Sequence, residues 1–109
     1  MHLEYCDESL NRISTWDQFP DSLIRSIHEL NAESDNDIKL PLLNGVGLYQ
    51  DTFFNTRQLK MILTELELFK KITENKEAQS VADSLIEYIN TVDLDDVENM
   101  GIYLRFVGD

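Results

Sequence analysis

The feature that most constrains the fold is a long amphipathic helix that begins at Asn55. Asn55 and Gln58 have the spacing of a capping box, in which each side chain accepts a hydrogen bond from the backbone amide of the other residue. Beyond this box, apolar side chains recur every three or four residues and hold one helical face for about four turns. They are Leu59, Ile62, Leu63, Leu66, Phe69 and Ile72. We therefore expect a helix whose apolar face is buried.

Two other stretches have the same periodicity. The first runs from Trp16 to Asn31, with Asp17 as the expected N-cap and Pro20 in the first turn, where its missing amide costs nothing. The second runs from about Lys76 to Thr91, after a break at Asn75. Their apolar stripes are Phe19, Leu23, Ile24, Ile27 and Leu30 in the first, and Ala78, Val81, Ala82, Leu85, Ile86 and Ile89 in the second.

The remaining apolar stretches are short and predict extended structure. Leu3 to Cys6 alternates like a strand and is expected at a sheet edge. Ile38 to Leu43 contains a proline, which favours an edge strand or an extended segment. Asn44-Gly45 predicts a turn, after which Val46 to Gln50 is expected to return as the second arm of a hairpin. Ile102 to Val107 is dense enough in apolar residues for a strand covered on at least one face.

Together these elements predict an α+β fold, in which a small, mainly antiparallel sheet packs with about three helices. Polar loops are expected at Asn31 to Asp37 and at Asp93 to Glu98. The chain has 109 residues, of which 34 are Leu, Ile, Val or Phe. That length suits one domain, and that apolar content is well above the roughly 20% below which charged chains stay disordered. We expect residues 1–109 to form a single domain.

Targeting signals are missing from the sequence. The first residues lack the basic stretch and apolar run of a secretory signal, and Glu65, Glu67 and Asn90 interrupt the longest apolar stretches. The single cysteine, Cys6, has no partner for an internal disulfide and is followed by two acids that would raise its pKa. We expect a cytoplasmic protein with no membrane span and an inert thiol.

No group of residues points to catalysis. Two histidines and one cysteine, scattered along the chain, are too few for a zinc site. The acids at 93–98 depart from the calcium-loop pattern because Glu98 stands where glycine is required, so weak divalent binding is left as a minor alternative. There is no glycine-rich phosphate loop and no nucleophile elbow around any serine. We expect a protein that is not an enzyme and has no cofactor or metal.

The charge distribution points to a protein partner. The formal net charge is −12, which disfavours nucleic acid and anionic membranes, and residues 77–104 contain no Lys, Arg or His. Such acids can be a solvated face kept for solubility. However, like charges four apart on a helix, such as Asp83 and Glu87, repel each other unless a partner neutralises them. The predicted partner-binding residues are Glu77, Asp83, Glu87, Tyr88, Asp93, Asp95, Asp96 and Glu98, with Tyr88 and Leu94 as apolar anchors.

Two segments resemble a group of small bacterial cytosolic proteins. They read Tyr49-Gln50-Asp51-Thr52-Phe53-Phe54-Asn55-Thr56-Arg57-Gln58-Leu59, followed by Glu65-Leu66, and Tyr103-Leu104-Arg105-Phe106-Val107-Gly108-Asp109. The group carries Asp-Thr-x-Phe-Asn-x-x-Gln before a helix and ends in Tyr-Leu-x-Phe-x-Gly-Asp. It is similar to the immunity proteins of polymorphic toxin systems, including contact-dependent growth inhibition. Gln50 departs from the group's glycine, and the first 45 residues carry no match.

The resemblance implies a protein that neutralises one toxin domain. Because the matched residues also have structural uses, namely capping a helix and pairing Arg57 or Arg105 with Asp51 or Asp109, we expect them to hold the fold. The toxin is then expected to meet the acidic stretch. The leading hypothesis is an immunity protein that occludes the active site of a basic nuclease, either an RNase or a DNase. The alternative is an acidic adaptor or regulatory module for another basic protein, and a small metal-dependent hydrolase ranks last.

Overall fold

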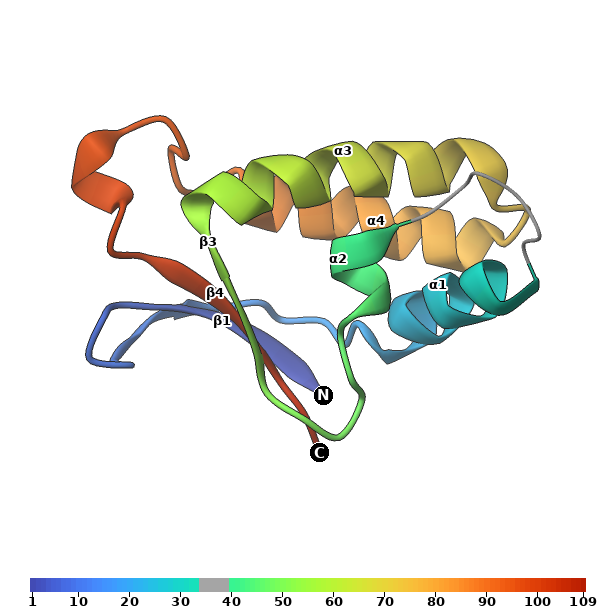
Figure 1. Ribbon diagram of the computed structural model, residues 1–109, viewed down its shortest axis with the longest axis horizontal. Helices are drawn as coiled ribbons and strands as arrows, with labels where there is room; N and C mark the ends of the chain where they lie inside the picture. The colour runs from blue at the N-terminus through green and yellow to red at the C-terminus, as the bar shows by residue number, and fades with distance from the viewer. Residues whose placement is uncertain (34–39) are drawn as a thin grey trace.

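The computed structural model describes residues 1–33 and 40–109. Its strands are β1 (His2–Cys6), β2 (Arg12–Thr15), β3 (Thr52–Asn55) and β4 (Tyr103–Val107). Its helices are α1 (Asp21–Glu33), α2 (Pro41–Asn44), α3 (Thr56–Ile72) and α4 (Lys76–Ile89), with a 3-10 turn η1 at Val97–Asn99. The strands form one sheet in the order β2-β1-β4-β3, and every neighbouring pair is antiparallel. The predicted α+β fold is confirmed (Figure 1).

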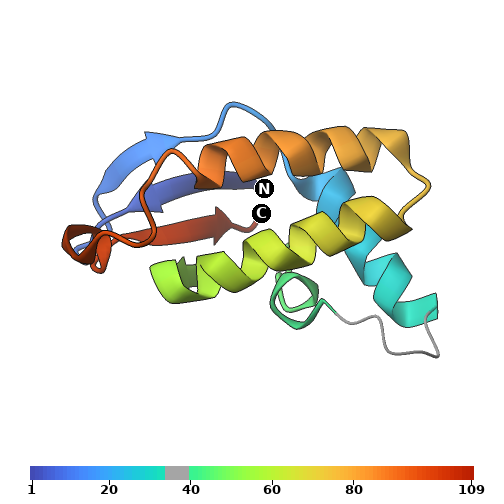
Figure 2. The same ribbon diagram turned by 90° about the horizontal axis from the view of Figure 1, so that it is seen from above.

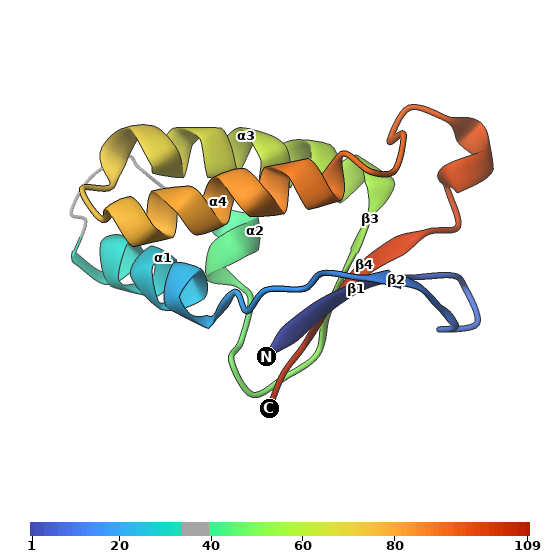
Figure 3. The same cartoon turned by 180° about the vertical axis from the view of Figure 1, so that it is seen from behind.

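The core lies between one face of the sheet and the inward faces of the helices. Leu3 and Tyr5 of β1 and Leu104 and Phe106 of β4 alternate along their strands and are fully buried. They belong to the same cluster of buried side chains as the apolar faces of α1, α3 and α4. Seen from above, α3 and α4 run side by side (Figure 2). The opposite face of the sheet is covered by none of the described helices (Figures 1 and 3).

The two C-terminal helices begin where their capping residues predict. Asn55 accepts a hydrogen bond from the Gln58 amide at 2.8 Å, and Gln58 accepts one from the Asn55 amide at 2.9 Å. This reciprocal pair is the predicted capping box. The Asn75 side chain likewise accepts from the Ala78 amide at 3.1 Å and caps α4. The predicted strand at 102–107 is also confirmed as β4.

The N-terminal elements differ from their predictions in position. The segment 3–6 forms a strand, but β1 lies inside the sheet, between β2 and β4, and is not an edge. The first helix begins at Asp21, not at Trp16, because the Pro20 carbonyl accepts its first helical hydrogen bond. Phe19 therefore precedes the helix and is 72% exposed. At the other end α1 continues to Glu33, which the sequence placed in a loop, and residues 34–37 lie outside the described residues.

The predicted hairpin over 38–50 is wrong. Residues 38 and 39 are outside the described part of the chain, and 41–44 form the short helix α2. Pro41 occupies its first turn, where a missing amide is harmless. A turn does follow at Gly45, as predicted, but 46–50 is not a strand. These residues form a helix and not a strand because the carboxylate of Glu65, on α3, accepts hydrogen bonds from the two free amides that follow Pro41.

Candidate partner-binding surface

All seven acids of the stretch 77–98 are exposed, but they do not form one cluster. Glu77 lies in the first turn of α4, and the loop at 93–98 follows the other end of that helix. A helix of 14 residues is about 20 Å long, so the two ends are well separated. Figure 3 shows α4 running between them. The acids nearest one another in the fold are those of the loop itself.

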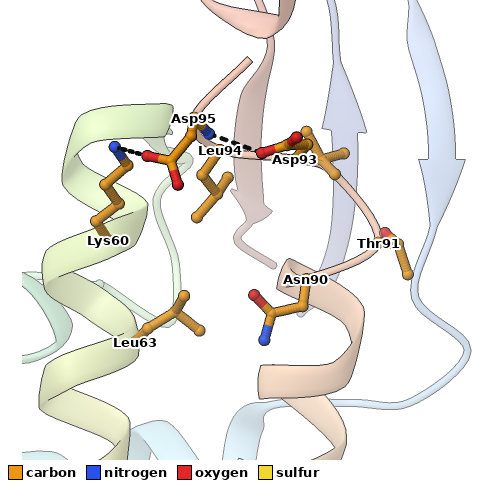
Figure 4. A pocket seen from close by; sticks show the side chains of 8 residues that line it. Lys60, Leu63, Asn90, Thr91, Asp93, Leu94 and Asp95 are labelled. Carbon is orange, nitrogen blue, oxygen red and sulfur yellow. Dashed lines mark hydrogen bonds and ion pairs between the residues drawn. The ribbon is translucent and has the colours of Figure 1, made fainter.

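Two of these acids are paired with lysines of α3, which corrects the expectation of an unpaired stretch. The Lys70 ammonium lies 2.5 Å from the Asp83 carboxylate, and this contact raises the pKa of Lys70. Lys60 forms an ion pair with Asp95 across the gap between α3 and the loop (Figure 4). Glu77, Glu87, Asp93, Asp96 and Glu98 have no ion pair with any described residue. The acidic surface therefore keeps most of its charge unneutralised.

The loop is held in shape by its own carboxylates. Asp93 Oδ1 accepts a hydrogen bond from the Asp95 amide at 3.0 Å, and Asp96 Oδ1 accepts one from the Glu98 amide at 2.9 Å. The second bond caps η1. The Asn99 side chain donates to the Asp93 carbonyl at 2.9 Å and closes the loop. A loop fixed in this way loses little conformational entropy when a partner binds.

An open pocket of about 500 Å³ separates the loop from α3. Figure 4 shows Lys60 and Leu63 on one side of it and Asn90 to Asp95 on the other. The Leu94 side chain is half-buried and packs against the core. By contrast, Val97 and Met100 are 76% and 61% exposed. The exposed apolar side chains of this region are thus these two, and not the predicted anchor Leu94.

Tyr88, the other predicted anchor, lies in the core. Its side chain is 9% exposed, and its ring packs 5.2 Å from that of Tyr5 and 6.4 Å from that of Trp16. The hydroxyl accepts a hydrogen bond from the Tyr5 amide at 3.1 Å and lies 2.9 Å from the hydroxyl of Ser14. Burial raises the pKa of Tyr88. Tyr88 is therefore not the exposed anchor that the sequence predicted, because its ring packs against Tyr5 and Trp16 and its hydroxyl contacts β1 and β2.

The fold adds two acids that the sequence analysis missed. Asp7 and Glu8 form the turn between β1 and β2, and this turn lies against the loop that follows η1. Asp7, Glu8, Glu98 and Gly101 line one open pocket, and Figure 1 shows both segments at the same end of the molecule. We call Asp7, Glu8 and the loop 93–98 the acidic end. Two adjacent acids between short strands indicate a turn, but nothing local indicates which segment it meets.

The residues of the resemblance hold the open face of the sheet together. Arg105 donates to Asp51 at 2.6 Å and to Glu4 at 3.3 Å, and Arg12 donates to the same Glu4 at 2.7 Å. Asp51 also accepts from the Gly108 amide at 3.0 Å. The predicted pairing of Arg105 with Asp51 is confirmed. These contacts link three strands and the C-terminal segment, which is a structural use.

This network gives a pH-dependent prediction for Asp51. The hydrogen bond from Arg105, followed by that from the Gly108 amide, holds the pKa of Asp51 below its ordinary value of 3.8. A lowered pKa in the folded state stabilises the protein above the unfolded pKa, and this stabilisation is lost as the pH falls through the folded value. Asp51→Asn is thus expected to lower the free energy of unfolding at neutral pH, with the difference shrinking below about pH 4. Urea titrations of both proteins between neutral pH and about pH 4 measure this difference in the free energy of unfolding.

The matched control is Asp17→Asn, which removes the same charge from an exposed position. It is expected to change the free energy of unfolding by less than Asp51→Asn at neutral pH. An effect of Asp51→Asn that does not vary between neutral and acidic pH would contradict an ionic role for this carboxylate.

The described residues contain no cluster of metal ligands and no exposed thiol. None of their His, Cys, Asp and Glu side chains form a group of three that could hold a metal ion. Cys6 is buried, and burial raises the pKa of its thiol. None of the helices in residues 1–33 and 40–109 is long and apolar enough to cross a bilayer. No known protein family, no curated protein and no solved structure matches this chain.

Proposed function

We propose that this protein is a bacterial immunity protein that binds one toxin domain and neutralises it. The toxin is a basic nuclease, and the acidic end together with the exposed acids of α4 covers its active site. The observation that carries the proposal is the stretch 77–98, in which seven exposed acids stand without a base and five have no ion pair with a described residue. The resemblance of 49–59 and 103–109 to immunity proteins supports the same function.

The mechanism is electrostatic and steric. A nuclease binds a phosphate backbone, so its active surface is positive. Carboxylates fixed on a rigid loop can occupy the positions that phosphates would take, and they speed association with such a surface. Asp93 and Asp96 keep the loop in one shape in the free protein. The inhibitor thus excludes nucleic acid by covering the active surface of the nuclease, without chemistry of its own.

A charge reversal tests the interface most directly at acids whose side chains make no contact that holds the fold. Asp95 is paired with Lys60, and Asp96 caps η1, so replacing either one changes the loop as well as the charge. Glu87 and Glu98 are exposed, and their side chains make no hydrogen bond or ion pair with the described residues. The variant of choice is therefore Glu87→Lys with Glu98→Lys. The proposed partner for this test is the product of the adjacent reading frame, prepared in a catalytically inactive form.

The double variant is expected to slow association with this partner by about tenfold at low salt and to weaken the salt dependence of the rate. The matched control is Glu29→Lys with Glu33→Lys, which changes the net charge equally on exposed positions of α1, away from the acidic end. Stopped-flow mixing measures the association rate of both double variants, and an activity assay measures how well each inhibits the active toxin. Equal rates for the two variants would remove the acidic surface from the interface, and no binding by the unaltered protein would contradict the proposed function.

A further inference from the structure

An apolar pocket lies beside the acidic end, on the face of the sheet that no described helix covers. Leu10, Phe53 and Tyr103 line it together with Glu8, and its volume is about 350 Å³. Leu10 is 54% exposed and Phe53 is 39% exposed. The pocket is large enough to accept one large apolar side chain. Exposed apolar side chains that converge in this way mark interaction sites more often than scattered ones do.

Leu10 is held in a backbone conformation that does not suit leucine. Its φ is +64°, in the left-handed region that glycine or asparagine adopts more easily. Asp7 fixes the turn, because its carbonyl accepts from the Leu10 amide at 3.0 Å and its carboxylate accepts from the Ser9 and Asn11 amides, each at 2.9 Å. The turn itself thus gains nothing from a leucine side chain. The side chain has to be explained by what it contacts outside the turn.

The two aromatic walls of the pocket are positioned before any partner binds. Phe53 pairs with Arg105 across β3 and β4, and Tyr103 lies two residues from Arg105 on the same face. The Arg105 guanidinium stands 5.5 Å from the centre of the Phe53 ring. That guanidinium is in turn held by Asp51 and Glu4. Binding in this pocket therefore orders few side chains, which favours affinity.

Glu8 joins the apolar pocket to the acidic end. It lines this pocket and also the one that contains Asp7 and Glu98. It approaches the loop closely at Gly101, where an added Cβ would lie 2.7 Å from the Glu8 carboxylate oxygen. One end of the molecule thus offers an apolar pocket with acids beside it. An apolar centre with polar groups at its rim is the usual composition of a specific interface.

We infer that the toxin inserts one large apolar side chain between Leu10, Phe53 and Tyr103, while a neighbouring Lys or Arg of the toxin pairs with Glu8. This inference rests on the proposed function and adds to the interface an apolar pocket on the open face of the sheet. A second copy of this chain does not suit the pocket, because two molecules of charge −12 would bring their acidic ends together. An uncharged partner would leave Glu8 desolvated without a counter-ion.

Leu10→Gly tests the pocket without harming the fold, because glycine adopts the positive φ more easily than leucine. The dissociation constant for the inactive toxin domain is expected to rise about tenfold or more, mainly through faster dissociation, while the midpoint of thermal unfolding stays equal or rises. The matched control is Met61→Ala on α3, which removes an apolar side chain that is also 54% exposed. Its dissociation constant should stay within about twofold of that of the unaltered protein. Titration calorimetry measures all three proteins.

The outcomes separate this inference from the proposed function. If Leu10→Gly binds as tightly as the unaltered protein while Glu87→Lys with Glu98→Lys slows association, the role of the pocket in binding is overturned and that of the acidic surface is supported. If Leu10→Gly and Met61→Ala weaken binding equally, the pocket is overturned as well. If the unaltered protein does not bind the toxin domain, the proposed function fails and this inference falls with it.

Discussion

Glu65→Ala is expected to lower the free energy of unfolding by about 2–4 kcal/mol, although Glu65 is an acid in a strongly acidic protein. The Glu65 side chain is buried and accepts from the amides of Leu42 at 3.2 Å and Leu43 at 3.0 Å. These are orphan amides of the first turn of α2, and its N-cap, Leu40, offers no side-chain acceptor. Alanine would leave both amides without a partner beside a buried leucine.

Glu65→Gln separates the charge from the hydrogen bonds. Glutamine keeps one acceptor oxygen, so about half of the loss is expected to return. The control is Glu67→Ala, an exposed acid of the same helix whose contact with Lys70 is long, at 3.4 Å. It is expected to change stability by less than about 0.5 kcal/mol. Urea unfolding followed by circular dichroism measures the three variants, and a Glu65→Ala protein as stable as Glu67→Ala would show that α2 does not depend on this carboxylate.

Tyr88→Phe is expected to cost about 1–3 kcal/mol of stability and to leave toxin binding unchanged. The substitution removes one oxygen and leaves the Tyr5 amide and the Ser14 hydroxyl without the partner that both now contact. Packing of the ring against Tyr5 and Trp16 is retained. The loss of stability therefore measures the contribution of the hydroxyl alone, which holds β1 and β2 against the end of α4.

The matched control for this variant is Tyr49→Phe, which removes a hydroxyl from a side chain that is 75% exposed. We expect its midpoint of urea unfolding to equal that of the unaltered protein. Calorimetric titration of Tyr88→Phe with the inactive toxin domain completes the test. A weakened complex with unchanged stability would return Tyr88 to the interface, where the sequence analysis placed it.

The elements that the sequence predicts well are those whose signals are local. The caps at Asn55 and Asn75 and the apolar stripes behind them set α3 and α4 almost to the residue. α2 could not be found in this way, because the acceptor for its amides comes from Glu65, 22 residues beyond Leu43. β2 was missed because Arg12–Thr15 has a mostly exposed pattern with no apolar alternation to mark it.

The candidate surface shows the same difference between local signals, which the sequence reveals, and contacts between distant segments, which it does not. Local composition correctly placed the acids of 77–98 on the outside, since each lies on a helix face or loop that carries no apolar stripe. It could not show that Lys60 and Lys70 of α3 neutralise two of them. Nor could it show that Tyr88 packs against Tyr5 and Trp16, or that the turn at Asp7 and Glu8 meets Glu98. Each of these contacts joins segments that are distant in sequence.

The lysine contacts of α3 have a consequence for how the molecule approaches a charged body. Five of the nine basic residues lie in 57–76, along α3 and at the start of α4, and the next 28 residues have none. The charge is therefore asymmetric, and the protein carries an electric dipole in addition to its net charge. In the field of a positive surface this dipole exerts a torque that turns α3 away from that surface and residues 77–98 toward it before contact. Orientation is then selected during diffusion, and a larger share of collisions begins with the correct face.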